Sequence, residues 1–107
     1  MRPKVLLVED NLINVMVGKQ ILEKSKLNVV VANDGATAVE MVKNNLFDVI
    51  LMDIQMPIMD GYTATTEIRK FNKKIPILAT TNKSSHHVYR MQWQHQISAL
   101  TPTFTGG

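Results

Sequence analysis

Four short apolar runs, at residues 4–8, 28–32, 48–52 and 75–80, constrain the fold of this chain more than any other feature. They lack the polar–apolar alternation of a half-exposed strand, and such runs are typical of strands buried on both faces of a parallel sheet. Helical patterns separate them. The resulting order, β-α-β-α-β-α-β, predicts an α/β fold in which right-handed crossovers build a parallel sheet.

The segments between the runs have helical spacing. In the first segment, the predicted apolar helix face consists of Ile13, Met16, Val17, Ile21 and Leu22. In the later two segments, the predicted apolar faces consist of Ala38, Val39 and Val42, and of Ala64 and Ile68. The turn residues of "NDG" (33–35) precede the second predicted helix, and Gly61 precedes the third.

Size and composition exclude several classes of protein. A chain of 107 residues with 45% hydrophobic and 20% charged residues fits one globular domain. No apolar run approaches the roughly 18 to 20 residues of a membrane span, the start does not resemble a signal peptide, and there are no cysteines. The net charge of +3 is too small to indicate nucleic acid binding. We expect a cytoplasmic location, without membrane contact by this segment.

Acidic side chains stand where the predicted strands end. The first run is followed by Glu9 and Asp10, the third by Asp53, and the fourth ends at Thr80 and Thr81. In parallel α/β sheets, ligands bind beyond the carboxyl ends of the strands, where the strand order reverses. If the first and third strands are neighbours, three carboxylates meet at one edge of the sheet.

Three such carboxylates repel one another, and a hard divalent cation removes that repulsion. Magnesium (Mg2+) takes oxygen ligands and typically retains several waters and a phosphate group. The sequence therefore predicts Mg2+ together with a phosphoryl ligand. Asp53 is the candidate nucleophile, and a hydroxyl of Thr80 or Thr81 is placed to hydrogen-bond the phosphoryl oxygens.

Simpler roles compete for some of these acids. Considered alone, Glu9 and Asp10 are equally well explained as an N-cap and a first-turn charge of the following helix. An aspartate at a strand end is common, but that explanation for Asp53 leaves the other two acids unexplained. Asp60, before Gly61, is most simply a turn or cap residue.

Four stretches resemble the receiver domains of two-component response regulators, most closely those of hybrid sensor histidine kinases. They are "VLLVEDN" (5–11), "VANDGATAVE" (31–40), "DVILMDIQMPIMDGYTATTEIR" (48–69) and "IPILATT" (75–81). The resemblance implies a flavodoxin-like, doubly wound parallel sheet with strand order 2-1-3-4-5. It also implies a signalling domain, not an enzyme, that accepts a phosphoryl group from a phosphohistidine on a histidine kinase or histidine phosphotransfer domain. A hybrid kinase is one candidate for the parent protein.

The same resemblance assigns roles to individual residues. Asp53 is the implied phosphoacceptor, and Glu9 and Asp10 match the acidic Mg2+-binding pair. The backbone carbonyl of Gln55 would supply a further metal ligand, and Thr81 matches the switch residue that contacts the phosphoryl group. The implied pocket loop contains Met56, Pro57 and Gly61.

The chain departs from the receiver pattern near its end. No lysine follows Lys83, so the family's phosphoryl-binding lysine has no counterpart, and the chain stops where the last helix is expected. We therefore divide the sequence into a receiver-like core, 1–83, and an atypical segment, 84–107, with a predicted helix, a short fifth strand and a loose tail. A truncated or frame-altered coding sequence and a degenerate receiver both explain this ending.

The departure leaves a second hypothesis open: a phosphorylation-impaired relic that acts as an interaction module, with a homodimer formed through the altered end. Trp93 with Tyr89 and Met91 fits a partner surface and a makeshift core equally well. The final segment also holds the three histidines, which lack companion acids or cysteines and are better explained as ordinary surface or half-buried residues than as metal ligands: His86, His87 and His95.

Overall fold

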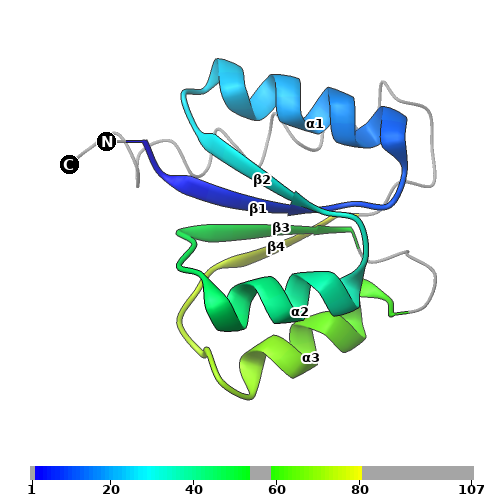
Figure 1. Ribbon diagram of the computed structural model, residues 1–107, viewed down its shortest axis with the longest axis vertical. Helices are drawn as coiled ribbons and strands as arrows, with labels where there is room; N and C mark the ends of the chain where they lie inside the picture. Colours follow the sequence, from blue (N-terminus) through cyan, green and yellow to red (C-terminus); the bar gives the residue numbers. More distant parts are fainter. Residues whose placement is uncertain (1, 54–58, 81–107) are drawn as a thin grey trace.

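The computed structural model describes residues 2–53 and 59–80, which form a parallel sheet with helices on both faces (Figure 1). The strands are β1 (Lys4–Val8), β2 (Asn28–Ala32), β3 (Val49–Asp53) and β4 (Ile77–Thr80). The helices are α1 (Leu12–Lys24), α2 (Gly35–Asn44) and α3 (Gly61–Arg69). The predicted element order is therefore confirmed, with strand bounds shifted by one or two residues for β3 and β4.

The strand order is β2-β1-β3-β4, and all pairings are parallel. Register places Val8 beside both Ala32 and Met52, and it places Asp53 beside Thr80. This confirms the predicted order 2-1-3-4. The expected fifth strand and last helix fall in 84–107, which lies outside the described residues.

Two apolar cores flank the sheet. Helix α1 covers one face, and α2 and α3 lie side by side on the other (Figure 1). Because side chains alternate along a strand, Val5 and Leu7 of β1 join the core beneath α1, whereas Leu6 and Val8 join the core beneath α2 and α3. Strands β1 and β3 are buried on both faces, which explains their uninterrupted apolar sequences.

The predicted apolar face of α1 is wrong at Ile13 and Met16, whereas Val17 is partly buried against the core as predicted. Ile13 and Met16 are 52% and 63% exposed. The helix instead buries Asn14, Val15, Gly18, Ile21 and Leu22. Two stripes with helical spacing overlap in this sequence and share the last turn, so periodicity alone did not decide which one faces the sheet.

Side-chain caps define where each helix begins. Asn11, Asp34 and Asp60 accept hydrogen bonds from backbone amides three residues ahead, at 3.1, 2.7 and 2.8 Å. The predicted capping role of Asp60 is thus confirmed. Gly35 starts α2 where a Cβ atom would stand 2.6 Å from the carbonyl oxygen of Met59, so only glycine allows this approach.

We expect Leu51→Ala to lower the free energy of unfolding by about 2 to 5 kcal/mol, because it leaves a cavity under a fully buried side chain of β3. Leu46→Ala removes the same atoms from a side chain that is 91% exposed and should change stability by less than about 0.5 kcal/mol. Urea denaturation followed by circular dichroism measures both. Equal losses in the two variants would contradict the assigned core.

Candidate functional site

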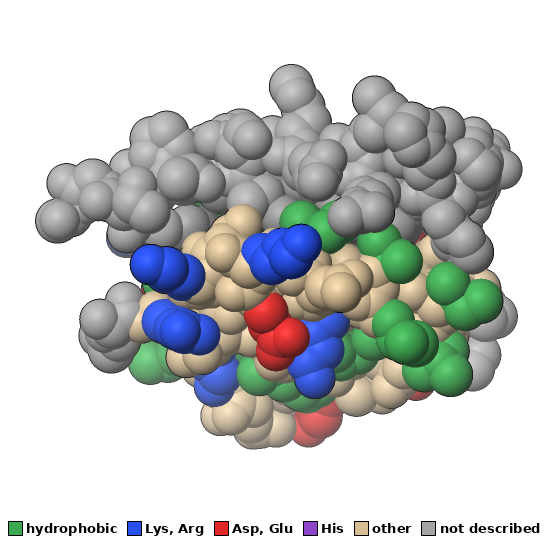
Figure 2. Space-filling model, turned by 90° about the horizontal axis from the view of Figure 1, so that it is seen from above, with side chains coloured by type: hydrophobic (Ala, Val, Ile, Leu, Met, Phe, Trp, Pro, Cys, Tyr) green, Lys and Arg blue, Asp and Glu red, His purple; other side chains and the backbone are tan. Residues whose placement is uncertain are grey.

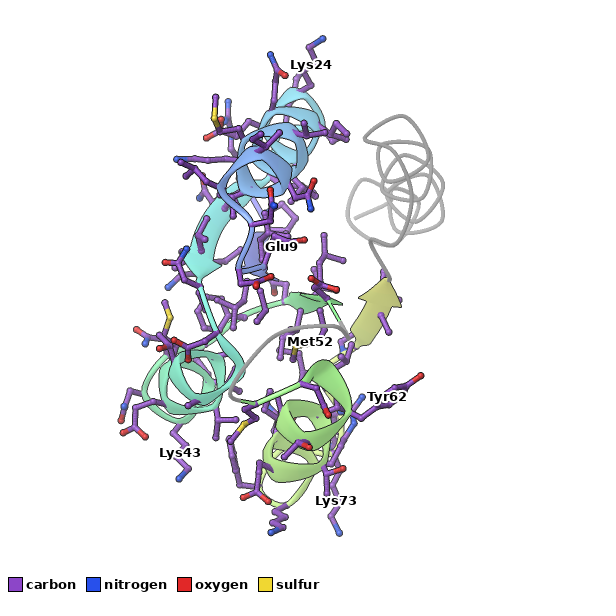
Figure 3. All side chains as sticks on the ribbon, turned by 90° about the vertical axis from the view of Figure 1, so that its right-hand side faces the viewer. Glu9, Lys24, Lys43, Met52, Tyr62 and Lys73 are labelled. Carbon is purple, nitrogen blue, oxygen red and sulfur yellow. The ribbon has the colours of Figure 1, made fainter. Side chains whose placement is uncertain are left out.

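Three carboxylates meet at the carboxyl ends of β1 and β3. These strands are hydrogen-bonded neighbours, so the acids that follow them converge as predicted. One carboxylate oxygen each from Glu9, Asp10 and Asp53 lies within 4.8 Å of the other two. Figure 3 looks at this edge of the sheet, with Glu9 between helix α1 and Met52 of β3.

The three acids differ sharply in burial. Glu9 is 0% exposed and Asp53 2% exposed, whereas Asp10 is open to solvent. Buried carboxylates are costly unless hydrogen bonds or ions stabilise their charge. The cluster therefore combines two buried acids with one exposed acid, and Asp10 is the member that solvent reaches.

Glu9 is held by the turn that leads into α1. Its Oε2 atom accepts a hydrogen bond from the Asn11 amide at 3.0 Å, and its own amide donates to the Ala32 carbonyl at 3.0 Å. Asn11, and neither Glu9 nor Asp10, is the N-cap of α1, and the first turn of the helix contains no acid. The capping alternative for these two acids is therefore wrong, although the Glu9 side chain accepts a hydrogen bond from the cap residue.

The donor set fits a hard divalent cation. All three side chains offer oxygen atoms, and their negative charges lie close enough to repel strongly when no cation is present. Within residues 2–53 and 59–80, no nitrogen or sulfur ligand of the kind that softer metals prefer belongs to this cluster. Among the described residues, the cluster can thus hold a cation such as Mg2+ through Glu9, Asp10 and Asp53.

Several predicted site residues lie outside the described part of the chain. These are Gln55, Met56, Pro57 and Thr81 of the predicted site, and His86, His87, Trp93 and His95 of the final segment. Gly61 is buried as the first residue of α3, and the backbone of Thr80 pairs with Asp53.

Asn14 is a polar residue of this region that the sequence analysis missed. Its side chain is 0% exposed, and neither its amide nitrogen nor its oxygen has a hydrogen-bond partner among the described residues. Leaving such a group unpaired costs about 1 to 3 kcal/mol. Asn14 lies four positions before Gly18 and seven before Ile21, so it shares their helix face. The sequence could have revealed this buried polar residue only if the buried face of α1 had been assigned correctly.

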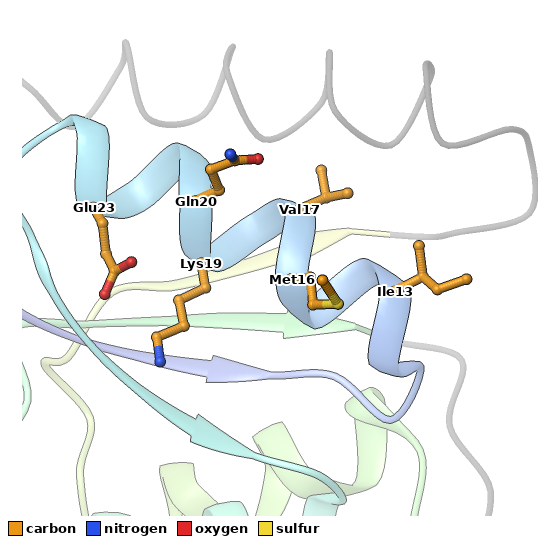
Figure 4. A pocket seen from close by; sticks show the side chains of 6 residues that line it. All are labelled: Ile13, Met16, Val17, Lys19, Gln20 and Glu23. Carbon is orange, nitrogen blue, oxygen red and sulfur yellow. The ribbon is translucent and has the colours of Figure 1, made fainter.

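A hollow runs along most of the length of α1 (Figure 4). Its lining residues are Ile13, Met16, Val17, Lys19, Gln20 and Glu23. Figure 2 views the molecule from this side, with apolar side chains towards one end of the face and Lys side chains towards the other. An exposed apolar patch with a charged border is typical of a surface that contacts another protein.

The Asp60 carboxylate has a pKa below its ordinary value of 3.8. The main cause is the hydrogen bond that its oxygen accepts from the Thr63 amide, which favours the charged form. The charged cap thus adds stability above the ordinary pKa, and this contribution is lost as the pH falls through the lower, folded-state pKa. Asp60 is the N-cap of α3, so the stability at stake is that of the start of this helix.

Comparison with known proteins places these features in a family. Residues 5–98 match the model of the response regulator receiver domain. The chain is 47% identical over 85 residues to hybrid signal transduction histidine kinase B of Dictyostelium discoideum, and 40% identical over 96 residues to the transcription factor SKN7 of Saccharomyces cerevisiae. These matches cover 79% and 90% of the chain, but only 4% and 15% of the two relatives.

A solved structure resembles the whole chain. It is the receiver domain of a sensor histidine kinase from Pseudomonas aeruginosa PAO1, which has a magnesium ion coordinated in its active site cleft. The TM-score is 0.80 at 29% sequence identity, and the match covers 100% of both chains. No helix among residues 2–53 and 59–80 is long and apolar enough to cross a membrane.

We expect Asp60→Asn to weaken the loss of stability in acid. Asparagine caps a helix about as well as aspartate but does not titrate in this range, so the variant should lose less stability than the wild type as the pH falls below 3.8. Denaturant unfolding midpoints measured from about pH 6 to about pH 2 test this. Glu23→Gln, at an exposed acid that caps no helix, is the control, and identical curves for Asp60→Asn and wild type would contradict the prediction.

Proposed function

The chain belongs to the response regulator receiver family, and from this premise we propose that it is the phosphoacceptor domain of a two-component phosphorelay. The observation that carries the proposal is the clustering of Glu9, Asp10 and Asp53 at the shared end of β1 and β3. Asp53 is the proposed phosphoacceptor, because it is the buried last residue of β3 and belongs to this cluster. The domain would accept a phosphoryl group without being an enzyme in its own right.

The proposed transfer uses side chains of this chain in distinct roles. A carboxylate oxygen of Asp53 attacks the phosphorus of a phosphohistidine, the phosphorus–nitrogen bond breaks, and the leaving imidazole takes up a proton. Glu9, Asp10 and Asp53 would hold Mg2+, which when bound offsets negative charge on the phosphoryl oxygens. By resemblance to the family, the Gln55 carbonyl adds a metal ligand and the Thr81 hydroxyl contacts the phosphoryl group.

The proposed phosphodonor is a histidine kinase or a histidine phosphotransfer domain. Hybrid histidine kinases are among the relatives, which supports a donor of this class. The hollow on α1 supports a docking surface for it, because Ile13 and Met16 are exposed on the helix that starts beside Glu9 and Asp10. A donor seated there would bring its histidine to the rim of the pocket.

A second candidate function is a protein interaction module that has lost phosphorylation. The observation that favours it is the absence of any lysine after Lys83, since a receiver uses such a lysine to stabilise charge on the phosphoryl group. In this case the altered end, 84–107, would serve association alone, including a homodimer. Phosphorylation and particle size separate the two candidates.

We expect incubation with acetyl phosphate and Mg2+ to add the mass of one phosphoryl group. Asp53→Asn should abolish the gain, whereas Asp48→Asn, at the opposite end of β3, should retain it. Removing the cation with EDTA should also prevent labelling, because the repulsion among the three acids would then oppose an incoming anion. Intact-protein mass spectrometry makes the measurement.

Wild-type protein that stays unlabelled under conditions that label an intact receiver would contradict the phosphoacceptor proposal. Sedimentation of the same sample then tests the second candidate. A stable dimer would support the interaction module, and a monomer would count against its homodimer form.

We expect Met16→Glu to slow transfer from a phosphorylated histidine phosphotransfer domain by roughly tenfold, because it places a charge in the apolar docking surface. Labelling by acetyl phosphate should keep its wild-type rate, since a small donor needs no docking surface. Leu46→Glu, which adds the same charge at another exposed apolar residue, is the control. Equal slowing with both donors would show damage to the pocket instead of lost docking.

A further inference from the structure

Helix α1 places one amide in an otherwise apolar interface. Its buried stripe runs through Asn14, Gly18, Ile21 and Leu22, and of these only Asn14 is polar. The opposite side of the same turn is exposed at Ile13 and Met16, so the Asn14 side chain is directed inward, away from solvent. Neither its donor nor its acceptor has a partner among the described residues.

This amide belongs to the turn that positions the acidic cluster. The Asn11 amide donates to Glu9 Oε2 at 3.0 Å, and the Asn14 amide donates to Asn11 Oδ1 at 3.1 Å. Two consecutive hydrogen bonds thus connect the carboxylate of Glu9 to the backbone of Asn14. Asn14 is therefore two hydrogen bonds away from a carboxylate of the acidic cluster.

The sheet brings the acids to the same side as α1. Val5 and Leu7 of β1, with Val49 and Leu51 of β3, face the core beneath this helix. Continuing the alternation by one step along each strand gives Glu9 and Asp53. Asn14, at the first turn of α1, is the end of the helical stripe that lies towards these strand ends.

Packing alone does not account for an asparagine here. A leucine would fill a buried position on an apolar stripe without leaving two polar atoms unpaired. A buried polar group without a partner needs a reason, such as a ligand or ion that supplies the partner. The nearby acids form such a ligand site, and Mg2+ keeps several waters when it binds carboxylates.

We propose that Asn14 is a positioning residue for the cation, whose side-chain amide hydrogen-bonds a water in the hydration shell of Mg2+ held by Glu9, Asp10 and Asp53. The proposal rests on the proposed function, because it requires that the acidic cluster bind Mg2+. Groups that orient a metal's ligands from outside typically change metal affinity 10- to 100-fold. Asn14 would give the buried side of the pocket a neutral hydrogen-bonding group that adds no further charge.

Asn14→Leu tests the inference through two measurements that should move in different directions. In EDTA, its melting temperature should equal or exceed that of the wild type, because two unpaired polar atoms are removed. Calorimetric titration of the metal-free protein with MgCl2 should show an affinity lower by about 10-fold or more. Asn14→Ala, which removes the amide without adding volume, should show the same loss of affinity.

Ile21→Val is the matched control, since it trims a buried side chain of the same stripe far from the acids. It should bind Mg2+ as tightly as the wild type, even if it melts earlier. Asn14 variants that keep wild-type affinity would overturn the inference, and so would variants that melt earlier in EDTA without losing affinity. Failure of the proposed metal site is distinguishable from failure of the role of Asn14. In the first case the wild type would not bind Mg2+, or Asp10→Asn would bind it as tightly as the wild type.

Discussion

The parallel pairing of β1 with β3 is the interaction on which the site depends. Register places Val8 beside Met52, so the residues that follow these two strands emerge next to each other. Neither strand carries the site alone, since Glu9 and Asp53 are 44 residues apart in sequence. Hydrogen bonds between the two strands, and burial of both on each face, fix the separation of these carboxylates.

The burial that stabilises the central strands also strengthens the attraction of the acids for a cation. Glu9 and Asp53 are almost entirely removed from water, so their charges are poorly screened, whereas Asp10 keeps contact with solvent. A protein with such a cluster gives up some stability in its metal-free state. A cation bound by the three acids would offset this cost, so the free energy of unfolding would rise with the cation concentration.

Helix α1 serves the site with both of its faces. Its buried face includes Asn14, which we propose to act on the bound cation, and its outer face exposes Ile13 and Met16. The Glu9 carboxylate accepts a hydrogen bond from the amide of the cap residue Asn11. The start of this helix is therefore hydrogen-bonded to the acidic cluster. The proposed phosphodonor surface thus lies on the same helix whose cap residue is hydrogen-bonded to Glu9.

The sequence by itself determined the strands and the three acids of the site, and its resemblance to receiver domains implied the strand order through β4. Uninterrupted apolar runs exclude most alternatives to a parallel sheet, and parallel strands must bring their carboxyl ends to one edge. The tertiary structure decided which stripe of α1 is buried, which residue caps it and that Asn14 lies inside without a described partner. These features depend on how the helix rotates about its axis against the sheet, and residues of both overlapping stripes satisfy the same periodicity. Only packing against Val5, Leu7, Val49 and Leu51 distinguishes the two rotations.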